Sequence, residues 1–171
     1  MFEKFISFVT LLEKMNKLFL ILIVLVILLY IRYNLKYEDD YQILQLNPSK
    51  LTPELLGEKR PIIVYGCEDP PQVLIQKAFR YTYLYCTKQS LIAEKIIKNT
   101  SKYAVISTDG ECEIEIINPK YNKTDYKSVV IQLKNTQFLI LPIFWRFKSS
   151  ITVNCIYVHD IFSSMYQSLS L

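Results

Sequence analysis

The sequence predicts an α+β protein in which an N-terminal transmembrane helix precedes a β-rich domain, a barrel or sandwich with short helices. Three observations predict this class: an unbroken apolar run from Leu18 to Ile31, few helix signals after it, and period-2 apolar segments beyond Lys102. We divide the 171 residues into an amphipathic segment and single anchor (1–36), an acidic linker (37–40) and a globular domain (41–171). The last part is long enough to bury one core.

The apolar run is bounded by Lys17 and Arg32. Its roughly 14 residues span only about 21 Å of a hydrocarbon layer about 30 Å thick. Because both flanking cations can extend toward the headgroups, a helix from Met15 to Leu35 reaches about 31 Å and crosses. The residues expected to face lipid along it are Leu18, Ile21, Leu25, Leu28 and Ile31. The predicted location is therefore a membrane, with the lipid bilayer as a partner.

Two alternatives to an uncleaved anchor stay open. A cleaved signal peptide needs small residues after its core, where the chain has Tyr30, Arg32 and Tyr33. A buried helix of a soluble protein rarely has apolar residues on every face. Residues 2–14 place apolar side chains on one stripe, which suits a helix in the membrane interface or an extension of the anchor.

Breaking residues divide the first part of the domain into short elements. Tyr41–Leu46 is predicted to be a strand, and Pro61–Tyr65 is predicted to be a buried strand that ends at Gly66. Between them, Thr52 as a cap, Pro53 at the first position and Gly57 at the end predict one helical turn.

Two further helices are expected before the strand-rich part. The first starts at Asp69 and has a common face formed by Leu74, Ala78, Tyr81 and Tyr85. The second starts near Ser90 and buries Ile92, Ile96 and Ile97.

From Lys102 onward the apolar period indicates strands. They are expected over residues 103–106, 113–117, 128–133, 138–141 and 151–158. Asp109-Gly110 predicts a type I′ turn that joins the first two strands in a hairpin. Asn135-Thr136 predicts another turn, and the tail from Asp160 is expected to be a short amphipathic helix.

Composition excludes several classes of function. Net charge is only +4 with acids and bases mixed, which argues against nucleic-acid binding. The cysteines, Cys67, Cys86, Cys112 and Cys155, lack the spacing of a zinc site; they either form two disulfides or act as small buried hydrophobes. The glycosylation sequons at Asn99 and Asn122 are expected chance matches.

One segment resembles a known family. Thr136–Phe147 contains Pro142-Ile-Phe-Trp145-Arg-Phe147, which is similar to the P-x-G-W-x-H pattern of the cupin superfamily, and of its Jumonji-type branch in particular. The likeness extends loosely from Gln42 to Val158, and it implies a cupin-like barrel. An anchor joined to a small degenerate domain of this kind also resembles uncharacterised membrane proteins of large DNA viruses. That resemblance implies a virion or a host internal membrane as the location.

The departures from the family pattern decide the expected chemistry. Active members hold iron with two His and one carboxylate and bind 2-oxoglutarate beside it. In this chain the last His of the pattern falls on Phe147, its Gly falls on Phe144, and the only histidine is His159, which we expect at the surface or in a cap. No metal, cofactor or catalytic residue is therefore predicted.

The remaining candidates are aromatic. Phe138, Pro142, Phe144, Trp145 and Phe147 are predicted to be either core or the wall of a ligand pocket. The first hypothesis is a non-enzymatic, membrane-anchored interaction or virion-structural scaffold that presents a surface to a protein partner. The alternative is a membrane-tethered module that binds an apolar or glycan ligand near Trp145.

Overall fold

The computed structural model describes residues 16–29, 41–79, 85–121 and 127–169. The chain divides into two compact units, Met1–Tyr37 and Glu38–Leu171, and each is described by itself.

In the first unit, residues 16–29 form a helix. Its apolar side chains are exposed, from 38% at Leu29 to 70% at Leu18, and they include Ile21, Leu25 and Leu28. Ile31 and the ends of the helix expected from Met15 to Leu35 lie outside the described residues. Within the described ranges, no helix combines the length and the apolar character that a membrane crossing requires.

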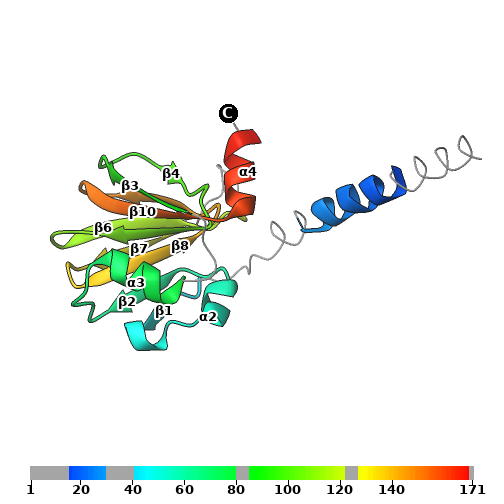
Figure 1. Ribbon diagram of the computed structural model, residues 1–171. Coiled ribbons are helices and arrows are strands. Elements are labelled where there is room, and N and C mark those ends of the chain that lie inside the picture. The colour runs from blue at the N-terminus through cyan, green and yellow to red at the C-terminus, as the bar shows by residue number, and fades with distance from the viewer. Residues whose placement is uncertain (1–15, 30–40, 80–84, 122–126, 170–171) are drawn as a thin grey trace, which may run out of the picture. The chain divides into compact units, whose positions relative to one another are not determined.

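The second unit is β-rich with few helices, which confirms the predicted α+β class (Figure 1). Its larger sheet contains, in spatial order, β1 (Leu44–Leu46), β2 (Ile62–Tyr65), β8 (Gln137–Pro142), β5 (Tyr103–Ser107), β10 (Val153–His159) and β3 (Tyr85–Leu91). Its smaller sheet contains β4 (Ile97–Lys98), β9 (Arg146–Ser149), β6 (Cys112–Ile117) and β7 (Ser128–Leu133). The helices are η1 (Pro48–Lys50), α2 (Pro53–Gly57), α3 (Pro71–Ala78) and α4 (Ile161–Leu169).

The strands from β3 to β10 pair in a nested order along the chain, the first with the last. β3 pairs with β10, β4 with β9, β5 with β8, and β6 with β7, all antiparallel. A chain folded back on itself in this way and wrapped into two sheets has the topology of a jelly roll. β1 and β2, which are parallel to each other, extend the larger sheet beyond β8.

The larger sheet buries both faces except at its edge strand β3, where residues 85–90 are exposed. On its outer face, the side chains of Val105, Ile140 and Val158 pack in one cluster with Leu74 and Ile75 of α3. Leu56 of α2 belongs to the same cluster. Thr52 caps α2 by accepting a hydrogen bond from the Leu55 N–H at 3.5 Å, as its sequence predicts.

The smaller sheet buries one face. Ile114 and Ile116 of β6 are fully buried, whereas Glu113 before them is exposed and Glu115 between them is half-buried. This alternation is the period-2 pattern of a half-buried strand. The buried face is directed toward the larger sheet, and the interior of the jelly roll lies between them.

Several elements differ from expectation. The helix predicted near Ser90 is wrong, because that segment is the end of β3, a turn and β4, and Ile92 and Ile96 are exposed. The helix from Asp69 is confirmed only as α3, since Tyr85 starts β3. The hairpin at Asp109-Gly110 is also wrong: β5 lies in the larger sheet and β6 in the smaller one, so the connection crosses between sheets.

Other elements agree with the sequence or were missed. β2, β7 and α4 are confirmed, and β8 follows the predicted turn at Asn135-Thr136. β1 is shorter than the strand predicted over Tyr41–Leu46. β9 was not predicted, because four residues with Arg146 and Lys148 among them give little apolar periodicity.

Candidate functional site

The turn between β8 and β9 is held by a buried asparagine. Asn99, which is fully buried, donates both side-chain amide hydrogens, to the carbonyls of Leu141 and Pro142 at 3.0 Å each. Its backbone N–H donates to the Trp145 carbonyl at 2.8 Å, and its backbone carbonyl accepts from the Phe144 N–H at 2.6 Å. The side chain is thereby occupied, so the sequon at Asn99 cannot accept a glycan in the folded chain.

The turn also contains an unusual backbone conformation. Phe144 has φ +67°, in the left-handed region that glycine adopts most easily. This is the position that Gly holds in the pattern the segment resembles. The hydrogen bonds to Asn99 fix the strained residue in place.

The predicted aromatic site does not form a single pocket. All five residues, Phe138, Pro142, Phe144, Trp145 and Phe147, are buried. Phe138 packs in the cluster beneath α3, on the outer face of the larger sheet, whereas Phe147 lies on β9 of the smaller sheet. Trp145 is 2% exposed, and its indole N–H donates to the Lys59 carbonyl at 3.3 Å.

Apolar side chains occupy the position at which the resembled family places its last histidine. Phe147, 1% exposed, lies directly across from Ile97 of β4 and from Ile116 of β6. Neither neighbour has a donor atom for a metal. Among the described residues, no three His, Cys, Asp or Glu side chains come together in a metal-binding group.

A polar cavity of about 250 Å³ lies elsewhere, lined by β3 and β10 at one edge of the larger sheet and by β4 of the smaller sheet. It is lined by Tyr85, Thr87 and Gln89 of β3, Tyr157 and His159 of β10, Lys98 of β4, and Thr100 and Gln167. The lining alternates along β3 and β10, since Tyr85 pairs with His159, and Thr87 with Tyr157. These residues therefore share one face of the larger sheet.

His159 is the most buried polar group of this cavity wall, at 3% exposure. Its ring stacks on Tyr85, with centroids 4.6 Å apart, and its Nε2 lies 3.1 Å from the Thr87 hydroxyl. Its Nδ1 has no hydrogen-bond partner among the described residues. Burial lowers the pKa of the imidazole, and the neighbouring Asp160 carboxylate opposes this only partly. The ring is neutral at pH 7.

Lys98 supplies the positive charge of the cavity. Its ammonium lies 4.9 Å from the ring centroid of Phe144 and 5.6 Å from that of Tyr166, and Nζ donates to the Tyr166 hydroxyl at 3.3 Å. The Phe144 ring and the Tyr166 hydroxyl thus hold the ammonium without neutralising its charge. The described lining contains neither Asp nor Glu. The nearest acid in sequence, Asp160, pairs with Lys102 at 3.4 Å and caps α4 through the Ser163 N–H at 2.8 Å.

Sequence reasoning missed this cavity. The expectation that His159 lies at the surface or in a cap is wrong, because its ring is inside the jelly roll. One signal was present: Cys155, Tyr157 and His159 alternate along a predicted strand and so share a face. The wall formed by β3 was not predicted, because part of that strand was interpreted as helix.

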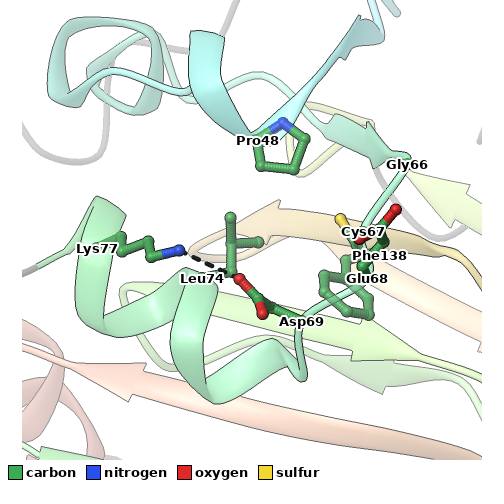
Figure 2. Close-up of a pocket in the computed structure, with 8 residues that line it drawn as sticks. All are labelled: Pro48, Gly66, Cys67, Glu68, Asp69, Leu74, Lys77 and Phe138. Atoms are coloured by element: carbon green, nitrogen blue, oxygen red, sulfur yellow. Dashed lines mark hydrogen bonds and ion pairs between the residues drawn. The ribbon is translucent and has the colours of Figure 1, made fainter.

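A second cavity, of about 210 Å³, opens on the other face of the larger sheet (Figure 2). Pro48 closes it on one side, and Leu74 and Lys77 of α3 on the other, with Phe138 at its floor. The Lys77 ammonium pairs with Asp69 at 3.1 Å, so the two charges satisfy each other.

The thiol in this second cavity is not activated. Cys67 donates to the Val64 carbonyl at 3.7 Å, and burial, then the Asp69 carboxylate, raise its pKa. A thiol that stays protonated is a poor nucleophile. All four cysteines are free, and burial raises the pKa of Cys155 to about 12. The two-disulfide alternative is therefore wrong for this structure, and Cys112 and Cys155 are buried in the core.

No protein-family model matches the chain, and no curated protein matches it. The site is therefore interpreted from its own residues.

Replacing Phe147 by Ala tests whether this ring is core. We expect Phe147→Ala to lower the free energy of unfolding by about 3–5 kcal/mol, because it leaves a cavity beside Ile97 and Ile116. Ile92→Ala, at a position 76% exposed, serves as the matched control and should change stability by less than about 0.5 kcal/mol. Urea melts of both variants provide the measurement. Equal small losses would show that Phe147 is not packed as described.

The lowered pKa of His159 predicts a pH dependence of stability. The unfolded imidazole, with a pKa of about 6.5, takes up its proton before the folded one does. The free energy of unfolding should therefore fall as the pH drops below about 6.5 through the lower folded-state pKa. Urea melts at several values between about pH 7.5 and about pH 5.5 measure this slope. His159→Gln should flatten it, and an unchanged slope in that variant would contradict the assignment.

Proposed function

We propose that the protein is a non-enzymatic, single-pass membrane protein whose cupin-like domain is an interaction or virion-structural scaffold. The observation that carries the proposal is the apolar pair of Phe147 and Ile97 at the position where an active relative would hold its metal. A jelly roll filled at this point keeps its shape but has lost the donors that catalysis would need. The nested pairing of β3 to β10 supports the cupin-like part of the proposal.

The membrane part rests on the N-terminal apolar run. Every side chain from Leu18 to Leu29 is apolar, and all are at least 38% exposed on the described helix. A helix that is apolar on every face has no polar side to turn toward water. Lys17 and Arg32 at its ends can reach the headgroups. The resemblance to membrane proteins of large DNA viruses suggests a virion or a host internal membrane.

The scaffold offers an exposed apolar surface for a partner. Ile92 and Ile96 lie in the loop between β3 and β4, and Ile151 lies between β9 and β10; they are 76%, 50% and 41% exposed. The two loops are joined by a hydrogen bond from the Glu94 N–H to the Ser149 carbonyl at 2.9 Å. Gathered apolar side chains of this kind suit a protein–protein contact.

The alternative, a ligand module with its pocket at Trp145, has less support. Trp145 packs edge-on against Tyr41, with centroids 5.9 Å apart, and its N–H is bonded to Lys59. Its ring is thus held as a core residue. Binding of a small molecule is better supported at the polar cavity around His159 and Lys98.

Alkaline carbonate extraction tests the anchor. We expect the full-length protein to remain in the membrane pellet, because the apolar run is embedded in hydrocarbon. A full-length variant with Leu22→Arg and Leu25→Arg places two charges in the run and should be released to the supernatant. Release of the wild-type protein from the membrane pellet would contradict the anchor. It would not bear on the proposal that the domain is a scaffold.

Elemental analysis tests the loss of metal. The purified protein should contain no stoichiometric iron, and its melting temperature should not change with chelator, because Phe147 and Ile97 provide no ligand atoms. Iron at one equivalent, or a melting temperature that falls when EDTA is added, would overturn the non-enzymatic proposal. Zinc and manganese measured in the same sample serve as controls for adventitious metal.

A further inference from the structure

The polar cavity between β3, β10 and β4 is open to solvent, since Thr87, Gln89 and Lys98 in its lining are exposed, whereas His159 in the same wall is 3% exposed. Thr87, Gln89 and Tyr157 face it from the larger sheet, while Lys98 and Thr100 face it from the other side. On the neighbouring strands the interior positions are apolar, as with Ile106 of β5 and Leu139 of β8, both fully buried. A buried polar atom lowers stability unless it has a hydrogen-bond partner, and among the described residues the Nδ1 atom of His159 has none.

The charge of the cavity selects an anion. Lys98 is the only charged residue among the described lining; its ammonium lies over the ring of Phe144 and donates to the Tyr166 hydroxyl. The remaining groups are hydroxyls and the imidazole, which can each donate one hydrogen bond when neutral, and glutamine amides, which can donate two. Gln167 of α4 is already placed against Thr100, with its Nε2 3.0 Å from the hydroxyl.

The types of hydrogen-bond donor in the lining indicate which class of anion fits the cavity. Planar carboxylates pair best with the fork of an arginine, and the described lining contains no Arg. A lysine acts as a point charge and is a common phosphate ligand. Single donors that approach from several elements suit a tetrahedral group with three free oxygens. The volume of about 250 Å³ leaves room for a small organic body beside the phosphate.

We propose that this cavity binds a small phosphorylated molecule, with the Lys98 ammonium as its charge partner and Thr87, Thr100 and Gln167 as neutral donors. His159 lies in the same wall, held by Tyr85 and Thr87. As the single histidine of the chain, it reports on the cavity without ambiguity. The proposal does not depend on the scaffold function, because it uses neither Phe147 nor the exposed isoleucines.

The test is a titration of the full-length protein in dodecyl maltoside, a detergent without phosphate, followed by the imidazole resonances in long-range ¹H–¹⁵N spectra. A tag without histidine keeps His159 as the only signal. The probes are inorganic phosphate and glycerol 3-phosphate, with malonate as a carboxylate and glycerol as a neutral molecule. We expect a saturable shift with both phosphates, at lower concentration for glycerol 3-phosphate, and no saturable shift with the other two.

Two variants separate binding from folding. Lys98→Met removes the charge and keeps the length of the side chain, so it should weaken binding about tenfold or more, the loss expected for a charge-assisted hydrogen bond. Lys88→Met, a neighbouring lysine on β3 that does not line this cavity, should leave binding unchanged. Backbone spectra of both variants show that they are folded.

Three results would overturn the proposal. They are the lack of a response to either phosphate, an equal response to malonate or glycerol, and a response to phosphate that Lys98→Met leaves unchanged.

Discussion

The hydrogen bonds of one buried side chain determine how the two sheets meet. Asn99 follows β4 of the smaller sheet, and its amide bonds the last carbonyls of β8 in the larger sheet. Its backbone groups hold the turn that leads into β9. A buried amide whose donors and acceptor are all used specifies its surroundings strongly, because no alternative packing would satisfy it as well. The same bonds hold Phe144 in its left-handed conformation, a strain that an isolated turn with this residue would avoid.

Asn99 also lies at the boundary between the apolar part of the interior and the polar cavity. Lys98 and Thr100 flank Asn99 in sequence, so fixing the asparagine fixes one wall of the polar cavity. Ile97, one residue further back, points with Phe147 into the apolar part of the jelly roll. Within four consecutive residues the chain therefore passes from apolar core to buried hydrogen-bond clamp to polar cavity wall. A substitution at Asn99 would disturb both regions together, whereas Phe147 and Lys98 can be changed separately.

The sequence predicted local features well and sheet membership poorly. α2 was readable because its cap, its Pro53 and its Gly57 act within one turn, and β2 because breakers bound an apolar run. The failures involve long-range pairing. Ile92, Ile96 and Ile97 have helical spacing, yet the residues before them pair with β10 as strand β3, and Ile97 pairs with Phe147 of β9. Asp109-Gly110 has the chemistry of a hairpin turn, but nothing local shows that β5 and β6 belong to different sheets. For the site, the sequence left core and pocket wall as alternatives for the aromatic residues, which the structure buries, while the polar cavity needed β3 to be recognised first.

Packing alone explains the residues in one part of the interior, around Phe147, but not those in the other part, around His159. At Phe147, Ile97 and Ile116, large apolar side chains face one another and burial alone accounts for their presence. At His159 it does not, since a neutral imidazole whose buried Nδ1 has no partner among the described residues costs about 1–3 kcal/mol relative to a satisfied group. An apolar residue of similar size would remove that cost. A buried imidazole that lowers stability, in the wall of a cavity that also contains the Lys98 ammonium, is the arrangement expected of a site that interacts with something other than the protein's own core.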